Sequence, residues 1–390
     1  MKTRMQPRVR WGLLVLVISV AALLVVASPM QRAWGMWGLA LTEILLLIVA
    51  ILPLRVFRWS FREVFAMKMP SLTQVLGVLV LWLGSYVAVL VSTVALYYFF
   101  PSGMDEVSNA ISDFFTSVPL PLALFVVAVL PGVCEEFLHR GLIQYTFQGK
   151  PKWLTIIGMA IIFGLFHLDL YRFIGTAILG GVLTYIMLKT NNLLLPILLH
   201  VINNTVSISL AFTSTENAGA AYMSLREVGS SLVIASVVPF LFLLGGRLLT
   251  PHQSSIGARR NSRATRVVAV LLSLLSFVSG AVLLVNGPPE PVLRTVLSQD
   301  VAPEDLGHQL PFTVETQGEY RLELAIEGDD GLLTTITIRD HGGAEVYRIT
   351  GQSLTVQSLL DLNEGEYVAS VRYDHTGSEY LKVKIDIVIR

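Results

Sequence analysis

Two adjacent glutamates, Glu135 and Glu136, follow a long uncharged stretch of the sequence, and His139 and Arg140 come shortly after them. Residues 114–134 contain no Asp, Glu, Lys or Arg. An ionised side chain inside a lipid bilayer is costly, so such residues there usually mark a functional site. The stretch LPGVCEEFLHRG therefore predicts a polar site within an apolar helix.

Helical geometry separates the roles of the two glutamates. Adjacent residues of a helix point about 100° apart, so Glu135 and Glu136 cannot serve one partner equally. Glu136 precedes Arg140 by four residues, the favourable order for an ion pair. The corresponding neighbour of Glu135 is His139, which compensates less when it is neutral. Glu135 is therefore the under-compensated carboxylate and the candidate general base.

Further polar residues recur in two later apolar stretches. His167 follows Phe163 by one turn in FGLFHL, and His200 and Asn204 lie four residues apart in LLHVINN. Each one alone is compatible with an ordinary interior hydrogen bond. With a rise of about 1.5 Å per residue, these residues and Glu135 reach similar depths, about 11–21 Å from the expected cytoplasmic ends of their helices. We expect them to meet near the middle of the bilayer, beside a helix break at Pro131–Gly132.

The composition indicates the class of protein that must hold this site. The chain is 53% hydrophobic and 14% charged, against about 25% charged residues in soluble domains. Its formal net charge is +0, which gives no reason to expect nucleic acid, and its one cysteine, Cys134, excludes an intrachain disulfide. Apolar runs predict an all-α polytopic bundle of about nine transmembrane helices. The expected spans are 11–28, 36–54, 73–99, 120–147, 153–169, 173–188, 193–213, 230–248 and 267–286.

Basic residues between these spans predict the orientation in the membrane. Nine spans place the basic clusters on one side, at residues 2–10, 55–68, 150–152 together with Lys189, and 259–266. The N-terminus is then cytoplasmic and the C-terminal tail extracytoplasmic, in a multi-pass protein of the cell membrane. The first span has the basic start and apolar core of a secretory signal peptide as an alternative, but its apolar part is long for that role.

The composition changes after Asn286. Gly287, Pro288, Pro289 and Pro291 indicate a linker, and residues 310–390 alternate between apolar and polar positions, as in YRLELAIE and LKVKIDIVIR. Turn sequences at 328–331, 341–343 and 362–366 separate these runs, so we expect a small β-sandwich. Its strand pattern resembles the pre-peptidase C-terminal modules of some secreted proteases, and we expect an accessory domain without chemistry of its own.

The predicted domains are an N-terminal transmembrane hairpin with a basic loop (1–70), an intramembrane core (71–215), two further helices with a linker (216–289) and the extracytoplasmic β-sandwich domain (290–390).

Three motifs occur in order on consecutive apolar stretches: E-E-x-x-x-R, F-x-x-x-H and H-x-x-x-N. Over roughly residues 70–215 the chain resembles the CAAX protease and bacteriocin-processing family of intramembrane glutamic endopeptidases, and is similar to the type II CAAX prenyl endopeptidase. The resemblance implies that Glu135 activates a water that His167 helps to hold. It implies that His200 and Asn204 stabilise the oxyanion, and that Glu136 and Arg140 form a supporting pair near Phe163. His139 stands where the family usually has an aromatic residue.

Other functions remain open at this point. Two glutamates and two histidines could bind zinc and activate the same water, although no H-E-x-x-H occurs. A cysteine protease built on Cys134 is disfavoured, because its side chain points about 100° away from that of Glu135. A transporter, a membrane scaffold or an immunity-type protein could hold the same polar residues. The resemblance implies no cofactor and no metal, and its expected partners are the lipid bilayer and a peptide or membrane-protein substrate; the oligomeric state is not specified.

Overall fold

The computed structural model divides the chain into two compact units, Met1–Gly287 and Pro288–Arg390, which are considered separately. The described residues are 5–213, 223–250, 256–287, 295–301, 309–314, 317–328, 334–351, 355–373 and 381–389. The expected domain boundaries at 215 and 289, the linker prolines and most of the turn at 328–331 lie outside them.

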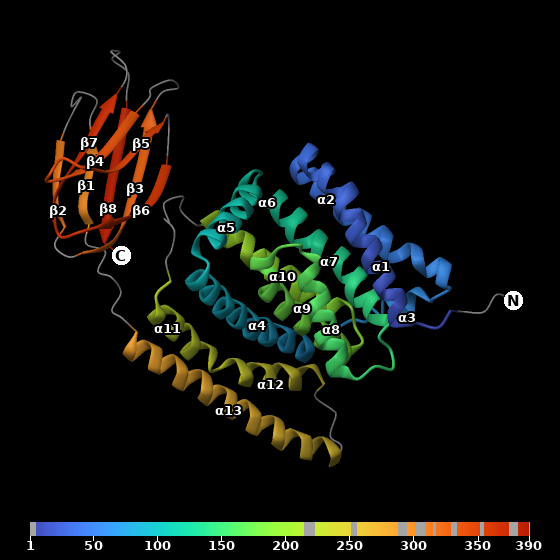
Figure 1. Ribbon diagram of the computed structural model, residues 1–390. Coiled ribbons are helices and arrows are strands. Elements are labelled where there is room, and N and C mark those ends of the chain that lie inside the picture. The colour runs from blue at the N-terminus through green and yellow to red at the C-terminus, as the bar shows by residue number, and fades with distance from the viewer. Residues whose placement is uncertain are drawn as a thin grey trace. The chain divides into compact units, whose positions relative to one another are not determined.

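The first unit is helical (Figure 1). Seven segments of the described chain are long and apolar enough to cross a membrane, and the prediction of a multi-pass helical protein is confirmed to that extent. These are Val9–Phe57, Leu72–Phe99, Leu120–Ile143, Leu170–Thr190, Leu194–Thr213, Leu225–Leu249 and Arg263–Asn286. The helices are α1 Val9–Ala22, η1 Leu23–Ala27, α2 Ser28–Phe57, α3 Phe61–Val64, α4 Leu72–Phe99, α5 Pro101–Thr116, α6 Leu120–Ala123, η2 Leu124–Val129, α7 Leu130–Glu136, η3 Phe137–Ile143, α8 Lys152–Phe166, α9 Leu170–Thr190, α10 Leu194–Thr213, α11 Leu225–Ala235, α12 Val238–Leu249 and α13 Ile256–Asn286, where η denotes a π-helical segment.

The count of nine crossings stays a prediction, because two regions do not appear as separate spans among the seven segments. The 49-residue segment Val9–Phe57 contains both of the first two expected spans. Gly35 breaks this segment with φ of 53° and ψ of −126°, so that the chain turns back as a hairpin. Glycine has no Cβ and tolerates this backbone conformation. The second region is α8, whose 15 residues are fewer than the roughly 20 that a perpendicular crossing needs.

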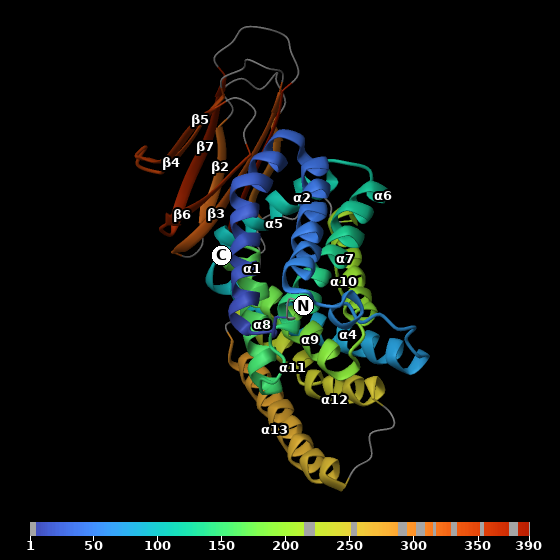
Figure 2. The ribbon, with the colours of Figure 1, turned by 90° about the vertical axis from the view of Figure 1, so that its right-hand side faces the viewer.

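The continuous helix from α6 to η3 lies between two groups of helices. On one side α2 packs against η2, α7 and η3, as Figure 2 shows for α2 and α7. On the other side α10 packs against η2 and α7, and it also contacts α4 and α9. Leu138 and Leu142 join the buried cluster of the N-terminal hairpin, whereas Phe163 joins a second cluster with residues of α4, α9 and α10. The polar side chains of the central helix are thus enclosed by apolar packing.

The last helices of this unit pack closely through small residues. Gly229 of α11 faces Gly280 of α13, where a Cβ on Gly280 would come within 2.6 Å of the Gly229 oxygen. In the same way, a Cβ on Gly245 of α12 would lie 2.9 Å from the carbonyl oxygen of Gly77 on α4. Such contacts let helix backbones approach in apolar surroundings, where van der Waals packing holds helices together.

The second unit consists of two four-stranded antiparallel sheets, with strand orders β1-β8-β3-β6 and β2-β7-β4-β5. Leu310, Phe312 and Val314 alternate with exposed residues along β2, which confirms the expected period of two at this strand. The prediction of a small antiparallel β domain is therefore confirmed, and packing of its sheets as a sandwich stays a prediction. The strands are β1 Thr295–Val301, β2 Gln309–Val314, β3 Gly318–Gly328, β4 Thr334–Asp340, β5 Glu345–Gly351, β6 Thr355–Leu362, β7 Gly365–Tyr373 and β8 Leu381–Ile389.

Candidate active site

The central helix stays continuous through Pro131 and Gly132, so the expected break before Cys134 is wrong. Proline lacks an N–H and crowds the carbonyl of the residue four positions earlier, here Val127. The helix accommodates this by widening to a π-helix over η2, and it widens again over η3, after the two glutamates. π-Helical segments are rare and occur frequently at functional sites.

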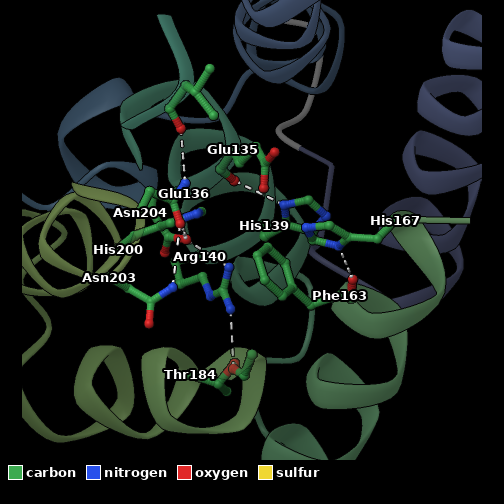
Figure 3. Close-up of polar contacts among 12 residues, drawn as sticks. Glu135, Glu136, His139, Arg140, Phe163, His167, Thr184, His200, Asn203 and Asn204 are labelled. Atoms are coloured by element: carbon green, nitrogen blue, oxygen red, sulfur yellow. Dashed lines mark hydrogen bonds and ion pairs between the residues drawn. The ribbon is translucent and has the colours of Figure 1, made fainter. Parts of the chain in front are cut away.

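Asn204 completes this accommodation from the neighbouring helix. Its Nδ2 donates a hydrogen bond of 3.1 Å to the carbonyl oxygen of Val127, the oxygen that an N–H at position 131 would bind in a regular α-helix (Figure 3). A side-chain amide nitrogen carries two hydrogens. One hydrogen of Asn204 therefore holds the central helix, and the other is available to a further acceptor.

Glu136 lies at the centre of a buried ionic network. Its Oε1 accepts a hydrogen bond of 2.8 Å from Nη1 of Arg140 and one of 2.9 Å from Nδ1 of His200. Both carboxylate and guanidinium are almost completely excluded from solvent, with exposures of 0% and 1%. Arg140 also donates to the carbonyl oxygen of Gly180 at 3.1 Å and lies over the ring of Phe163, 4.2 Å from its centroid. Glu136 is therefore a structural anion that joins the central helix to α10.

Glu135 points to a different side of the helix, toward His139, as Figure 3 shows. Its side chain is half-buried, and its Oε2 is a buried atom without a hydrogen-bond partner among the described residues. Electrostatic interactions link this carboxyl group to His200, Glu136, Arg140 and Arg172. The two adjacent glutamates therefore have different surroundings. Glu136 is bonded to two donors, whereas Glu135 lies at the edge of this network.

The two histidines beside Glu135 are each held by a hydrogen bond from Nδ1 to a backbone carbonyl oxygen. Nδ1 of His139 donates to the carbonyl oxygen of Glu135, and Nδ1 of His167 to that of Phe163, each at 2.9 Å. A carbonyl only accepts, so Nδ1 carries the proton and Nε2 is an acceptor in each neutral ring. Both rings lie edge-on to Phe163, with centroid separations of 5.0 Å. His167 ends α8, where a positive φ of 54° at Leu168 turns the chain toward α9.

The structure thus groups the residues predicted from the sequence in two sets. Glu136, Arg140, Phe163 and His200 form one bonded cluster. Glu135 and His167 lie at its edge, and no hydrogen bond or ion pair joins them in the described chain. His200 binds Glu136 rather than Glu135. Asn204 binds the backbone of Val127.

One charged residue of this region, Glu43 of α2, was not predicted from the sequence as part of the site. It is 3% exposed and interacts electrostatically with Glu135. It is the only Asp, Glu, Lys or Arg between Arg32 and Arg55. A lone carboxyl group in an apolar segment was therefore the signal that could have found it.

The arrangement does not suit a zinc ion. Catalytic zinc is held by three protein ligands that converge on one point. In the described residues no three His, Cys, Asp or Glu side chains are placed to hold a metal ion together. Glu136 and His200 are bonded to each other through Oε1 and Nδ1, so this pair of atoms is already engaged.

The fold and this site define a multi-pass membrane protein with a carboxylate–histidine centre enclosed by its helices. Residues 117–206 match the family described as type II CAAX prenyl endopeptidase Rce1-like. The chain is also 23% identical over 219 residues to the "Putative membrane peptidase YdiL" of Bacillus subtilis (strain 168), across 53% of this chain and 83% of that protein. No solved structure matches the chain. The resemblance to the CAAX protease family is therefore confirmed over residues 117–206, and both similarities support a membrane-embedded protease.

The hydrogen bond between Asn204 and Val127 leads to a testable coupling. Asn204→Ala should lower the thermal stability, because a buried acceptor loses its donor at a cost of about 1–3 kcal/mol. In a Pro131→Ala background the loss should be clearly smaller, since the new N–H at position 131 can bind Val127. Thermal unfolding of the two single variants, the double variant and the unchanged protein in detergent measures this coupling. Additive losses would contradict the assignment.

Proposed function

We propose that the protein is an intramembrane endopeptidase that hydrolyses a peptide bond with a water activated by Glu135. The observation that carries this proposal is the difference between the two glutamates in the partners that their side chains bind. Oε1 of Glu136 is bonded to Arg140 and His200, whereas the Glu135 side chain makes no such ion pair in the described chain; Oε2 of each of the two carboxyl groups is a buried atom without a hydrogen-bond partner there. A half-buried carboxylate that is not bonded to a cation is suited to take a proton from a bound water.

The remaining residues have roles that fit this chemistry. As Glu135 removes a proton, the water oxygen attacks the peptide carbonyl carbon and an oxyanion develops. Asn204 has a second amide hydrogen with which to stabilise that charge. His200, whose ring is oriented by the bond of Nδ1 to Glu136, stabilises the same oxyanion. His167, with its proton fixed on Nδ1, offers Nε2 as an acceptor that orients the attacking water.

The substrate is expected to be a peptide or a membrane protein that reaches the site within the bilayer. The purified protein, reconstituted in liposomes with membrane-inserted peptides of varied sequence, should release two defined fragments from at least one of them, as determined by mass spectrometry. Activity should persist after exhaustive dialysis against a strong chelator. Loss of activity that returns only with added zinc would support the zinc peptidase instead. Binding of peptides without cleavage would support a scaffold.

We further propose that the N-terminus is cytoplasmic and the β domain extracytoplasmic, on the basis of the basic loops. Protease added to intact spheroplasts should then remove residues 290–390 and leave the helical unit protected. Immunoblotting with tags at both ends measures the result, and lysed spheroplasts serve as the control for accessibility. A tail that is cut only after lysis would reverse the orientation and exclude an odd number of crossings with a cytoplasmic N-terminus.

The division into domains is also proposed to be functional, with residues 71–215 as the protease core. A chain that ends at Gly287 should insert and fold, because the unit Met1–Gly287 is compact by itself. Its melting temperature and its cleavage rate should lie close to those of the full chain. A truncated protein that inserts but unfolds at a much lower temperature would show that the β domain is needed for the fold of the helical unit.

A further inference from the structure

Glu43 is a buried acidic residue in an otherwise apolar helix. Its side chain is 3% exposed, and its Oε2 has no hydrogen-bond partner among the described residues. An unpaired, ionised carboxylate in such a place is costly, so the group is neutralised by a proton or belongs to a site. No cation interacts with Glu43 in the described structure, since its electrostatic partner there is Glu135.

The position of Glu43 on α2 directs it to the central helix beside Glu135. The buried residues of α2 recur at helical spacing, and Glu43 lies between Ala40 and Leu46 on this stripe. Ala40 belongs to the cluster of Val127, and Leu46 belongs to the cluster of Leu138. Glu43 therefore faces the turn of the central helix that lies between those two levels. The electrostatic interactions of Glu43 with Glu135 and of Cys134 with both carboxyl groups agree with this placement.

The ionisable groups on the elements packed against this part of α2 are few. On α7 they are Cys134, Glu135 and Glu136, and on η3 they are His139 and Arg140; η1 and η2 have none, and α1, which also contacts α2, has Arg10. Arg172 of α9 interacts with Glu135, the other carboxyl group. Glu136 and Arg140 bind each other. Glu43 thus adds a second carboxyl group near Glu135 without adding a cation. Two neighbouring carboxyl groups in a medium of low polarity resist double ionisation, so one proton is retained by the pair.

We propose that Glu43 and Glu135 form a carboxyl pair that holds one proton, with Glu43 as the protonated member and the proton donor of the reaction. The inference rests on the proposed endopeptidase function. Glu135 takes one proton from water as the C–O bond forms. When the C–N bond breaks, Glu43 gives its proton to the leaving nitrogen and becomes a carboxylate. Transfer of the proton from Glu135 to Glu43 then restores the starting state, so that protons balance over one turnover.

The first test does not depend on activity. Infrared spectra of the reconstituted protein near neutral pH should contain the C=O stretch of a buried protonated carboxyl group, which shifts in D2O. This band should disappear in Glu43→Gln and persist in Glu135→Gln and in Glu43→Asp. Glu106→Gln, an exposed change on α5, serves as the control. A spectrum without the band in the unchanged protein, or a band that survives in Glu43→Gln, would overturn the pair.

The second test uses cleavage rates as a function of pH. In the unchanged protein the rate should fall on both sides of an optimum, because the pair works only with one proton. Glu43→Gln should lower kcat by about 10²-fold, leave KM and the melting temperature nearly unchanged, and abolish the alkaline limb. Cys134→Ala should keep that limb, which excludes the thiol as its origin. A Glu43→Gln protein with an unchanged rate or an unchanged profile would overturn the donor role, whereas an unchanged protein that cleaves no peptide would overturn the proposed function and leave the infrared test in force.

Discussion

Glu135→Gln should reduce the rate of peptide cleavage by about 10²–10⁴-fold, the usual contribution of a general base. The amide keeps the size and much of the hydrogen bonding of the carboxyl group, but it cannot accept a proton from water. Because Glu135 makes no ion pair in the described structure, the variant should fold and unfold like the unchanged protein. Single-turnover cleavage in liposomes and thermal unfolding in detergent measure the two effects.

The control for this prediction is Glu106→Gln, the same change at an exposed position of α5. It should leave both the rate and the melting temperature unchanged. A Glu135→Gln protein with a greatly lowered melting temperature would show that Glu135 supports the fold rather than the chemistry.

Glu136→Gln should have its largest effect on stability. The change removes the anion that binds both Arg140 and His200. Among the described residues, the direct partners that the buried guanidinium keeps are the Gly180 carbonyl and the Phe163 ring. Breaking a buried ion pair from one side costs about 3–5 kcal/mol. We therefore expect a much lower melting temperature and a lower yield of inserted protein.

The double variant Glu136→Gln with Arg140→Met separates the two contributions. It contains neither charge, so it should regain a substantial part of the stability lost in Glu136→Gln, while activity stays low because His200 lacks its partner. Arg140→Met alone should be destabilised, because Glu136 loses Arg140 and keeps only His200 of these two partners. A double variant that is less stable than both single variants would contradict the buried pair.

The sequence allowed local contacts to be predicted better than contacts between helices. The four-residue spacing of Glu136 and Arg140 is enough to bring them together, and they form the expected ion pair. The bond from His200 to Glu136 joins residues 64 positions apart. It depends on how α10 crosses the central helix, which helical periodicity does not specify.

The helix break predicted at Pro131–Gly132 was wrong because it was inferred from the local sequence alone. Proline within a helix usually indicates a kink or a break. Here the helix absorbs the proline through a π-helical segment, and the amide of Asn204 bonds the crowded carbonyl oxygen. The π-helical segment and the hydrogen bond from Asn204 both depend on the structure around Pro131, which the local sequence does not specify. The turn at Gly35, by contrast, falls in the gap between the expected spans 11–28 and 36–54, where Gln31 and Arg32 interrupt the apolar run.

In the C-terminal unit, alternation of apolar residues predicted strands but not their order. The first and last strands pair with each other, through Leu297 and Ile387 among others, and β3 pairs with both β6 and β8. Which of these distant strands pair depends on how the whole unit folds to bury its apolar residues. A period of two along each strand does not contain that information.

The most direct test of hydrolysis by a glutamate-activated water is cleavage of one defined membrane peptide in water enriched in ¹⁸O, by the unchanged protein and by Glu135→Gln. The unchanged protein, freed of metal by dialysis, should introduce one ¹⁸O atom into the new carboxyl terminus without any covalent peptide adduct on the protein. Glu135→Gln should form almost no product over the same time. A peptide adduct on Cys134, or labelled product from Glu135→Gln at a rate close to that of the unchanged protein, would contradict hydrolysis by a glutamate-activated water.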